Sequence, residues 1–464
     1  QWNLDKFREY FSSVFYNSDL PTDLVTEQVV SEPPFTIEEV KAAILSQRTK
    51  GAAGCDGISA AMLKSAMDII GTWLANLFNA VRILCHCPTD LGCGVLVPIY
   101  KPGKQMGIPK SYRPITLLSV VRKVLTCILN RRTRTAADSY VRESQAGFRP
   151  GRSTADGVFY SRMLCERAML GDWSYSAALL DFSGAFDTLV RSTALDRMTV
   201  AGAQTSTVSA LISNTTARVK ISSQLGEAFP TNIGVVQGDP LSPTMFNMYA
   251  EGAMRKIDAV STLARTQDVP SPSTQYADDT TMHASSRSAV ETIVATCEPI
   301  FKEDNLNLNV QKTVYLTASR TDASWKTVKL LGSLLDSTED VAARIGAASR
   351  AFGSIAWKRH CLDSRLCMFS VLIVPVLLYN CGLWTLTKRQ NEQLDVWQRR
   401  KLRYIFGVHY PHCISNQILY EKSKQQPISR VCKRRRLLWF GHVVREGPGT
   451  ASYGALTMAI DTSK

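Results

Sequence analysis

The change of pattern along the chain is the feature that most limits its possible folds. From Gly51 to about Leu331 short apolar strands alternate with helical segments, and after Gly332 the apolar spacing is that of helices alone. The strands that we expect are Val95–Tyr100, Tyr175–Leu180 and a hairpin over Gln275–Thr281. The helices that we expect are Ser119–Arg134, Val341–Trp357, Ser364–Tyr379 and Lys388–Phe406. Mixed strands and helices followed by helices predict an α+β fold with an all-helical C-terminal region.

The first segment of the chain is typical of a helical extension joined to the rest by a linker. Trp2–Tyr16 has amphipathic helical spacing, and Pro21–Pro34 is largely polar and bounded by prolines. The capping-box pattern Thr36–Glu39 then starts a helix that runs through Leu45. Because the sequence opens with Gln1, we expect a longer polyprotein as its source. These boundaries predict three parts: 1–35, 36–335 and 336–464.

Charge and composition favour a globular protein with a polyanionic partner. The 464 residues suit two to three packed subdomains, and the net charge of +14 favours phosphate-rich partners through counterion release. The basic run Lys433–Arg436 is also compatible with a solvated face or a nuclear-import signal. The 12 cysteines show no small-domain framework, and the apolar run Val371–Tyr379 is too short to cross a bilayer. We therefore expect an intracellular protein with reduced thiols and no membrane partner.

Three aspartates stand where a polymerase would need metal ligands. The apolar strand Tyr175–Leu180 runs directly into Asp181, and Asp278 and Asp279 are adjacent in the predicted hairpin turn. Nucleotide polymerisation uses two divalent ions, and Mg²⁺ prefers carboxylate oxygens. An isolated Asp-Asp pair is more often a solvated turn, so this pattern gains its meaning from the surrounding motifs.

Those motifs resemble, in order, the motif set of the non-LTR (LINE-type) retrotransposon reverse transcriptases, jockey-like elements among them. One tetrapeptide would be weak, but many collinear blocks across roughly residues 50 to 335 are specific. The matching blocks are Pro98–Lys104, Tyr112–Leu118, Gln145–Thr154, Asp181–Asp187, Gln237–Pro243, Tyr276–Asp279, Leu308–Thr313 and Leu330–Gly332. The resemblance implies a right-hand polymerase with fingers, an antiparallel palm sheet and a helical thumb, and it places fingers and palm in 36–335 and the thumb in 336–464.

The resemblance also assigns roles in catalysis. It implies that Asp181, Asp278 and Asp279 bind two Mg²⁺ ions, with Mn²⁺ as a substitute, and that Asp187 gives structural support. Phe186 matches the aromatic residue that excludes a ribose 2′-hydroxyl, although a plain core phenylalanine would also fit this position. Lys312, in a loop of variable position, matches a lysine proposed to protonate the leaving pyrophosphate.

Further positions match residues that contact substrate, template or primer. Arg113 matches the fingers arginine that grips the triphosphate, with Lys101 or Lys104 assisting. Gln237 and Gly238 match the position beside the nucleotide sugar and templating base, where glycine permits close approach. Gly332 lies in the block that resembles the primer grip. Arg149 and Arg152 are interpreted as template contacts, with an ordinary basic turn as the alternative; a surface arginine is the alternative for Arg113.

The partners implied by the resemblance are an RNA template, a DNA primer or target DNA, and dNTPs. The family mechanism is target-primed reverse transcription, which implies a cytoplasmic ribonucleoprotein and a nuclear stage. The C-terminal block Arg434–Val443 is similar to the tail of these proteins, and a basic helical thumb fits an A-form hybrid. A zinc site from His412, Cys413, Cys432 and His442 is disfavoured by irregular spacing. The oligomeric state stays open.

Two other functions compete with a reverse transcriptase. A domesticated RNA-binding scaffold would keep the fold without the chemistry, and the three intact aspartates argue against it. An RNA-dependent RNA polymerase or a group II intron maturase would share the palm, whereas Phe186 and Ala277 point to DNA synthesis. Templated incorporation of dNTPs against rNTPs distinguishes these three functions.

Overall fold

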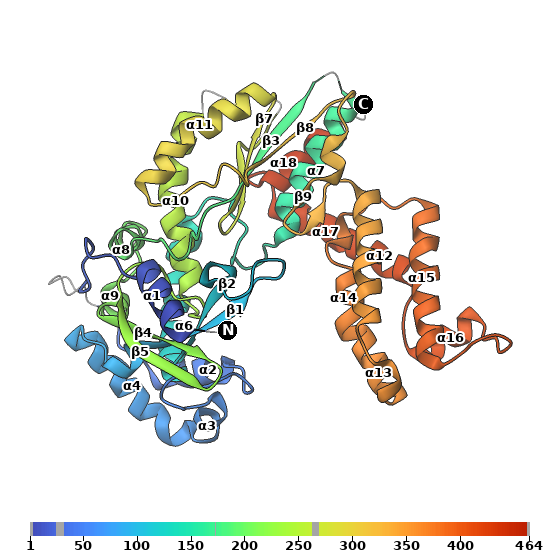
Figure 1. Cartoon of the computed structure of the whole chain (residues 1–464). Helices are drawn as coiled ribbons and strands as arrows, with labels where there is room; N and C mark the ends of the chain where they lie inside the picture. Colours follow the sequence, from blue (N-terminus) through green and yellow to red (C-terminus); the bar gives the residue numbers. More distant parts are fainter. Residues whose placement is uncertain (1–2, 25–31, 172, 262–268, 462–464) are drawn as a thin grey trace. The chain divides into compact units, whose positions relative to one another are not determined.

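The computed structural model describes residues 3–24, 32–171, 173–261 and 269–461. The chain divides into two compact units, each made of segments that are separate in the sequence (Figure 1). The first unit comprises Gln1–Phe148, Asp181–Thr262 and Ala295–Lys312. The second unit comprises Arg149–Leu180, Leu263–Val294 and Thr313–Lys464.

The first unit contains a four-stranded sheet in the order β2-β1-β4-β5. The strands are β1 (Cys93–Tyr100), β2 (Tyr112–Leu118), β4 (Thr215–Ile221) and β5 (Gln224–Thr231). β1 pairs antiparallel with β2 and parallel with β4, and β4 and β5 form an antiparallel hairpin. Every second residue of β4 is buried, so one face of this hairpin packs on a core and the other faces solvent.

Helix α1 (Leu4–Phe15) covers the buried face of β4 and β5. Phe7 and Phe11 are fully buried, and the ring of Phe7 meets Tyr112 edge-on at 5.1 Å between centroids. Burial of each ring contributes about 1.5–3 kcal/mol. The other helices that lie wholly within the first unit are α2 (Ile37–Ser46), α3 (Ala60–Ser65), α4 (Met67–Leu84), α5 (Thr89–Gly92), η1 (Pro109–Ser111), α6 (Val120–Tyr140), α8 (Arg191–Val200), α9 (Ser206–Ile212) and α10 (Ser242–Ser261).

The second unit contains an antiparallel sheet in the order β6-β7-β3-β8. The strands are β3 (Tyr175–Leu180), β6 (Ser273–Tyr276), β7 (Asp279–Ala284) and β8 (Val314–Ala318). β3 is paired on both sides and carries mostly buried small or apolar residues. Helix α7 (Thr154–Leu170) packs on this sheet, and α18 (Ala451–Asp461) lies beside α7 (Figure 1). Helix α11 (Arg287–Glu303) spans the division between the units.

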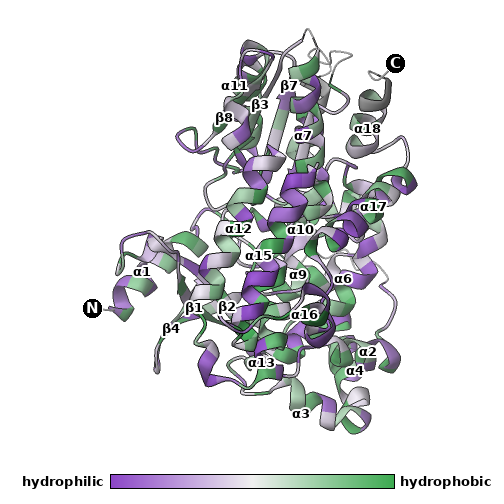
Figure 2. Ribbon diagram, turned by 90° about the vertical axis from the view of Figure 1, so that its right-hand side faces the viewer, coloured by the Kyte–Doolittle hydropathy of each residue, from purple (hydrophilic) through white to green (hydrophobic). Residues whose placement is uncertain are grey.

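After a two-stranded hairpin, β9 (Lys329–Leu330) and β10 (Ser333–Leu334), the second unit is helical. Its helices are α12 (Ser337–Gly353), η4 (Trp357–Arg359), α13 (Leu362–Met368), the π-helix η5 (Phe369–Ile373), α14 (Val374–Leu377), η6 (Cys381–Leu383), α15 (Lys388–Phe406), α16 (Asn416–Ser423) and α17 (Ile428–Glu446). They enclose a separate core that includes Phe369, Trp384 and Leu394. Hydrophilic stretches run along α15 and α17 (Figure 2).

Most expected elements are confirmed, and several of their boundaries are corrected. The strand Tyr175–Leu180 and the helix Lys388–Phe406 have the expected bounds. The helix expected from Ser119 uses this residue as its N-cap and continues to Tyr140, beyond Arg134. The helix expected over Ser364–Tyr379 is interrupted by a π-helical turn just before Pro375, which lacks a backbone N–H. The strands β4 and β5 were not expected.

One further helix lies about one helical turn from its expected position, whereas the expected strand Val95–Tyr100 is confirmed as β1, Cys93–Tyr100. The helix expected over Val341–Trp357 begins at Ser337, because Asp336 caps it, and ends at Gly353. The expected capping box at Thr36 is present in full: its side chain accepts from the Glu39 N–H, and the Glu39 carboxylate accepts from the Thr36 N–H. The N-terminal helix is confirmed over Leu4–Phe15, whereas part of the expected linker lies outside the described residues.

Candidate active site

The expected hairpin is formed by β6 and β7, with an aspartate in its turn. Tyr276 pairs with Asp279, so Ala277 and Asp278 make a two-residue turn. Ala277 has φ 59° and is buried. This position of a tight hairpin turn normally favours glycine, and a left-handed alanine costs about 1–2 kcal/mol. The turn that carries Asp278 and leads into Asp279 is therefore strained at Ala277.

The third aspartate, Asp181, directly follows the paired strand β3. In the antiparallel pair of β3 and β7, Leu180 lies opposite Thr280, which follows Asp279. Asp181 is the next residue after Leu180, and its side chain is 42% exposed. Asp278 is half-buried and Asp279 is exposed. Carboxylate oxygens, without sulfur or imidazole donors, are the ligand chemistry of hard divalent cations.

A buried polar cluster supports the hairpin from within the same sheet. His283 on β7 bonds through Nδ1 to the Tyr175 hydroxyl at 2.7 Å and through Nε2 to the Thr274 hydroxyl at 2.9 Å. Burial lowers the pKa of His283 to about 3. The neutral ring therefore fastens β7 to β3 and to β6, which fixes the base of the turn that carries the aspartates.

Asp181 and Lys312 are brought together within the first unit. The Lys312 ammonium donates to Oδ2 of Asp181 at 3.0 Å. The backbone fixes this approach, since the Asn309 N–H donates to the Asp181 carbonyl at 2.8 Å and the Lys312 N–H donates to the Asn309 carbonyl at 3.0 Å. The Lys312 side chain is 60% exposed, so the pair itself adds less than about 1 kcal/mol of stability.

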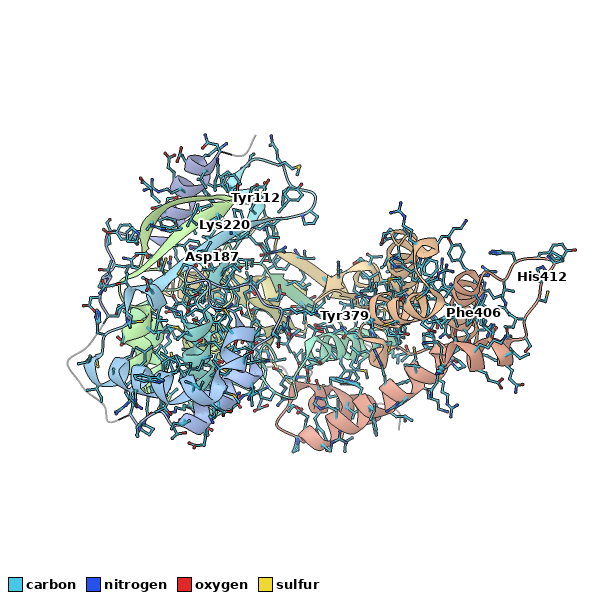
Figure 3. All side chains as sticks on the ribbon, turned by 90° about the horizontal axis from the view of Figure 1, so that it is seen from below. Tyr112, Asp187, Lys220, Tyr379, Phe406 and His412 are labelled. Carbon is cyan, nitrogen blue, oxygen red and sulfur yellow. The ribbon has the colours of Figure 1, made fainter. Side chains whose placement is uncertain are left out.

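Gln237 and Gly238 lie against strand β2 and against Asp187 in the first unit. The side-chain amide of Gln237 donates to Oδ1 of Asp187 at 2.9 Å, and the backbone carbonyl of Gln237 accepts from the Thr116 N–H at 3.0 Å. Gly238 has φ 125°, and a Cβ there would lie 2.8 Å from the Thr116 carbonyl oxygen. Only glycine fits this place. Asp187, which is labelled in Figure 3, thus holds the Gln237 side chain.

Basic side chains gather near Asp187 in the same unit. Lys101 follows β1, and Arg113 on β2 lies opposite Ile99 with its side chain exposed. Burial lowers the pKa of Lys101, and the charges of Arg113, Lys312 and Lys104 lower it further, whereas Asp187 opposes them. The crowding of these cations suits a polyanionic ligand such as a triphosphate.

The Phe186 ring is clamped between two other aromatic rings. It stacks on the buried Phe246 at 4.1 Å between centroids with planes 20° apart. Phe148 meets it edge-on at 6.3 Å. The Val235 N–H donates to the Phe186 carbonyl at 2.9 Å, which fixes the backbone as well. The ring is therefore rigid and half-buried, as a steric barrier requires.

The predicted primer-grip block forms a tight turn in the second unit. Leu331 and Gly332 join β9 to β10 with φ 46° and 85°, and Ser333 pairs with Leu330. Two successive positive φ angles are typical of a type I′ hairpin turn. Leu331 and Gly332 thus form a tight turn between β9 and β10.

Two arginines, Arg149 and Arg152, lie in the loop before α7 in the second unit. Arg152 pairs with Glu446 of α17, and both side chains are largely buried. Arg149 is half-buried at the start of the same loop.

Sequence reasoning missed a cluster formed by Asp156, His442 and Glu446. The His442 ring nitrogen Nε2 lies 3.9 Å from a carboxylate oxygen of each partner. Among the residues that the structure describes, these three form the one set of three His, Cys, Asp or Glu side chains with ligand atoms within 4.8 Å of one another. His442 is surrounded by carboxylates here, and the cluster ties α7 to α17. Nothing local in the sequence joins Asp156 to residues so distant.

No helix in the described parts of the chain is both long and apolar enough to cross a membrane.

The sequence resembles known reverse transcriptases over most of its length. The sequence model of the family described as "Reverse transcriptase (RNA-dependent DNA polymerase)" matches residues 99–335, more than half of the chain. The chain is 23% identical over 421 residues to "Probable RNA-directed DNA polymerase from transposon BS" of Drosophila melanogaster, covering 81% of this chain and 45% of that protein. It is 25% identical over 435 residues to "Retrovirus-related Pol polyprotein from type-1 retrotransposable element R2" of Popillia japonica, covering 87% and 59%.

The chain spans about half the length of the curated relatives that it matches. The structure overlaps 69% of this chain with 60% of a solved telomerase from Candida albicans, at 10% identity and a TM-score of 0.39. The matched residues 99–335 include Asp181, Asp278 and Asp279 and the strands β3, β6 and β7 beside them. The chain belongs to the reverse transcriptase (RNA-dependent DNA polymerase) family, and the curated relatives that it resembles are proteins of transposons and retrotransposable elements.

Proposed function

We propose that this chain is an RNA-directed DNA polymerase that extends a primer 3′-hydroxyl with dNTPs, in the whole protein by target-primed reverse transcription. The observation that supports this most is the pairing of Leu180 with Thr280. When this register is continued by one residue, Asp181 comes opposite Asp279. Two acidic segments nearly a hundred positions apart in the sequence then converge on one catalytic centre.

Reverse transcriptases use divalent metal ions, and we propose two Mg²⁺ ions, with Mn²⁺ as a substitute, held by Asp181, Asp278 and Asp279. When bound, such ions activate the primer hydroxyl and neutralise the charge of the triphosphate. The side chains hold oxygen ligands ready at a strand end and a hairpin turn, and the strained Ala277 fixes the turn. Lys312 balances the charge of Asp181 and serves as the general acid for the leaving pyrophosphate.

The nucleotide pocket is proposed to lie in the first unit. Arg113 and Lys101 bind the triphosphate, for which the crowding of basic charge near Asp187 gives the physical reason. Gln237 and Gly238 line the pocket beside the sugar and the templating base, and their contacts with Asp187 and Thr116 keep them in place. The Phe186 ring, held rigid by Phe246, excludes a 2′-hydroxyl and so favours dNTPs.

The template and primer are proposed to be RNA and DNA strands held partly by the second unit. The turn at Gly332 positions the primer end, and Arg149 and Arg152 contact the template; Arg152 must then leave or share Glu446. Functionally, residues 36–335 act as fingers and palm and 336–464 as thumb, whose helices α15 and α17 are strongly basic. The proposed locations are a cytoplasmic ribonucleoprotein and the nucleus.

Primer extension on an RNA template tests this function. We expect Mg²⁺-dependent incorporation of dNTPs by the wild type and a loss of at least about 10³-fold in Asp278→Ala. No incorporation by the wild type, or undiminished incorporation by Asp278→Ala, would reject the proposal. A scaffold without chemistry would bind RNA and synthesise nothing, and an RNA polymerase would prefer rNTPs.

A further inference from the structure

The turn at Leu331 and Gly332 is held in a conformation that its own sequence disfavours. Leucine at φ 46° costs about 1–2 kcal/mol relative to a right-handed conformation. The hairpin that carries the turn has only two residues in each strand, β9 and β10. So short a hairpin does not hold itself together, and its shape must come from surrounding groups.

Two side chains from the helical region supply these contacts. The Tyr379 hydroxyl donates to the Leu331 carbonyl at 2.8 Å, and the Arg344 guanidinium donates to the Gly332 carbonyl. Arg344 also stacks over the Tyr379 ring at 4.4 Å and has only 16% of its side chain exposed. Both carbonyl groups of the turn are thus bound by one pair of mutually packed side chains.

Tyr379 and its chain neighbour Asn380 contact two further groups. The Tyr379 hydroxyl lies 3.0 Å from the Thr154 hydroxyl, and Thr154 is the first residue of α7, directly after the loop of Arg149 and Arg152. The Asn380 amide donates to the Ser333 hydroxyl at 3.1 Å. Because the Tyr379 hydroxyl has one proton and gives it to Leu331, Thr154 is the donor of the second bond.

We propose that Tyr379 and Arg344 are positioning residues that lock the primer turn to the start of the template loop. This inference rests on the proposed function of Gly332 as the primer grip. A locked turn keeps the primer 3′-hydroxyl in line with the incoming nucleotide, so its loosening lowers kcat while the KM for dNTP, set in the first unit, stays unchanged. Tyr379, labelled in Figure 3, therefore affects the alignment of the primer 3′-hydroxyl and is not itself a catalytic residue.

The Tyr379→Phe variant tests the inference, because it removes the hydroxyl and keeps the ring that packs on Arg344. The matched control is Tyr420→Phe, which removes a hydroxyl bonded to Gln398 at 3.3 Å in the same helical region, away from the turn. We expect kcat to fall about tenfold in Tyr379→Phe with the dNTP KM unchanged, and wild-type kinetics in Tyr420→Phe. Wild-type kcat in Tyr379→Phe would overturn the inference.

Hydrogen exchange gives a second readout that does not depend on activity. Amides of residues 329–335 should exchange about tenfold faster in Tyr379→Phe than in the wild type or in Tyr420→Phe. Unchanged exchange would refute the lock even if the wild type were inactive. Faster exchange in Tyr379→Phe, together with a wild type that incorporates no dNTP, would reject the proposed function and leave the lock supported, so the two failures are distinguishable.

Discussion

The Lys312 ammonium lies 3.0 Å from Oδ2 of Asp181, and two backbone hydrogen bonds through Asn309 fix the approach. These backbone hydrogen bonds place Lys312 beside an expected metal ligand, whereas the exposed ion pair itself adds little. A group positioned in this way can deliver a proton to a leaving pyrophosphate.

Lys312→Ala should therefore lower kcat about 10²-fold without changing the dNTP KM or the midpoint of thermal unfolding. Lys312→Arg keeps the pairing with Asp181, but a guanidinium does not release its proton, so kcat should stay low. Steady-state kinetics of both variants check this, with the exposed Lys302→Ala as control. Recovery of kcat in Lys312→Arg would show that charge alone is needed.

Replacement of Phe186 by valine should weaken discrimination against rNTPs by about 10²-fold, because the clamped ring no longer fills the space of a 2′-hydroxyl. Competition between dNTPs and rNTPs measures the effect. The control is Phe182→Val, since Phe182 packs on Phe301 in the same segment and has no proposed substrate contact. Unchanged discrimination in a Phe186→Val enzyme that still uses dNTPs would exclude the ring as the barrier.

Gly238→Ala should raise the dNTP KM and lower the thermal midpoint, because its Cβ would meet the Thr116 carbonyl oxygen at 2.8 Å. We expect a stability loss of about 2 kcal/mol or more. Gly407→Ala provides the comparison: its φ is 70°, with nothing within 4 Å of the added Cβ, so it suffers backbone strain of about 1 kcal/mol alone. Equal losses in both variants would mean that the close approach at Gly238 is irrelevant.

The buried His283 should make stability depend on pH. Its pKa is about 3 when folded and 6.5 in the unfolded reference, so the unfolded state takes up the proton first as the pH falls. Stability therefore decreases between pH 6.5 and 3, by about 1.4 kcal/mol on going from pH 7.5 to 5.5. Denaturant unfolding of the wild type and of His283→Gln at both values measures the difference, and an equal pH response of the two proteins would contradict it.

The exposed cations Lys433, Arg434 and Arg436 on α17 should contribute to nucleic-acid binding. The binding constant K for an RNA–DNA hybrid should be measured at several salt concentrations. Changing all three residues to glutamine should make the slope of log K against log salt less steep by about 2–3. The control with equal loss of charge changes Lys256, Arg287 and Lys302 to glutamine. If both triple variants shift the slope equally, α17 has no special role.

Local patterns were enough to predict the elements that present the aspartates and a long helix of the C-terminal region. Tyr175–Leu180 is a run of small and apolar residues because β3 is paired on both sides within the sheet. Lys388–Phe406 begins at a capping box formed by Thr387 and Gln390. The hairpin of Asp278 and Asp279 was likewise visible as polar turn residues between segments with strand preference.

Contacts between distant segments could not be predicted in this way. Arg152 and Glu446 are far apart in the sequence, and so are Tyr379 and Leu331, so no periodicity or spacing links them. The strand β4 did leave a signal, since Ala217, Val219 and Ile221 alternate with exposed or partly exposed residues, but polar and basic neighbours obscured it.

Metal-directed cleavage would measure the convergence of the aspartates most directly. Fe²⁺ bound in place of Mg²⁺ is oxidised to Fe³⁺ by added hydrogen peroxide, which is cleaved to hydroxide and a hydroxyl radical, and this radical cuts the backbone close to the bound ion. We predict cuts near Asp181 and near Asp278–Asp279 in the same protein, with both suppressed by excess Mg²⁺ and lost in Asp181→Asn. Cuts confined to one of these segments, or unaffected by Mg²⁺, would contradict a shared metal site.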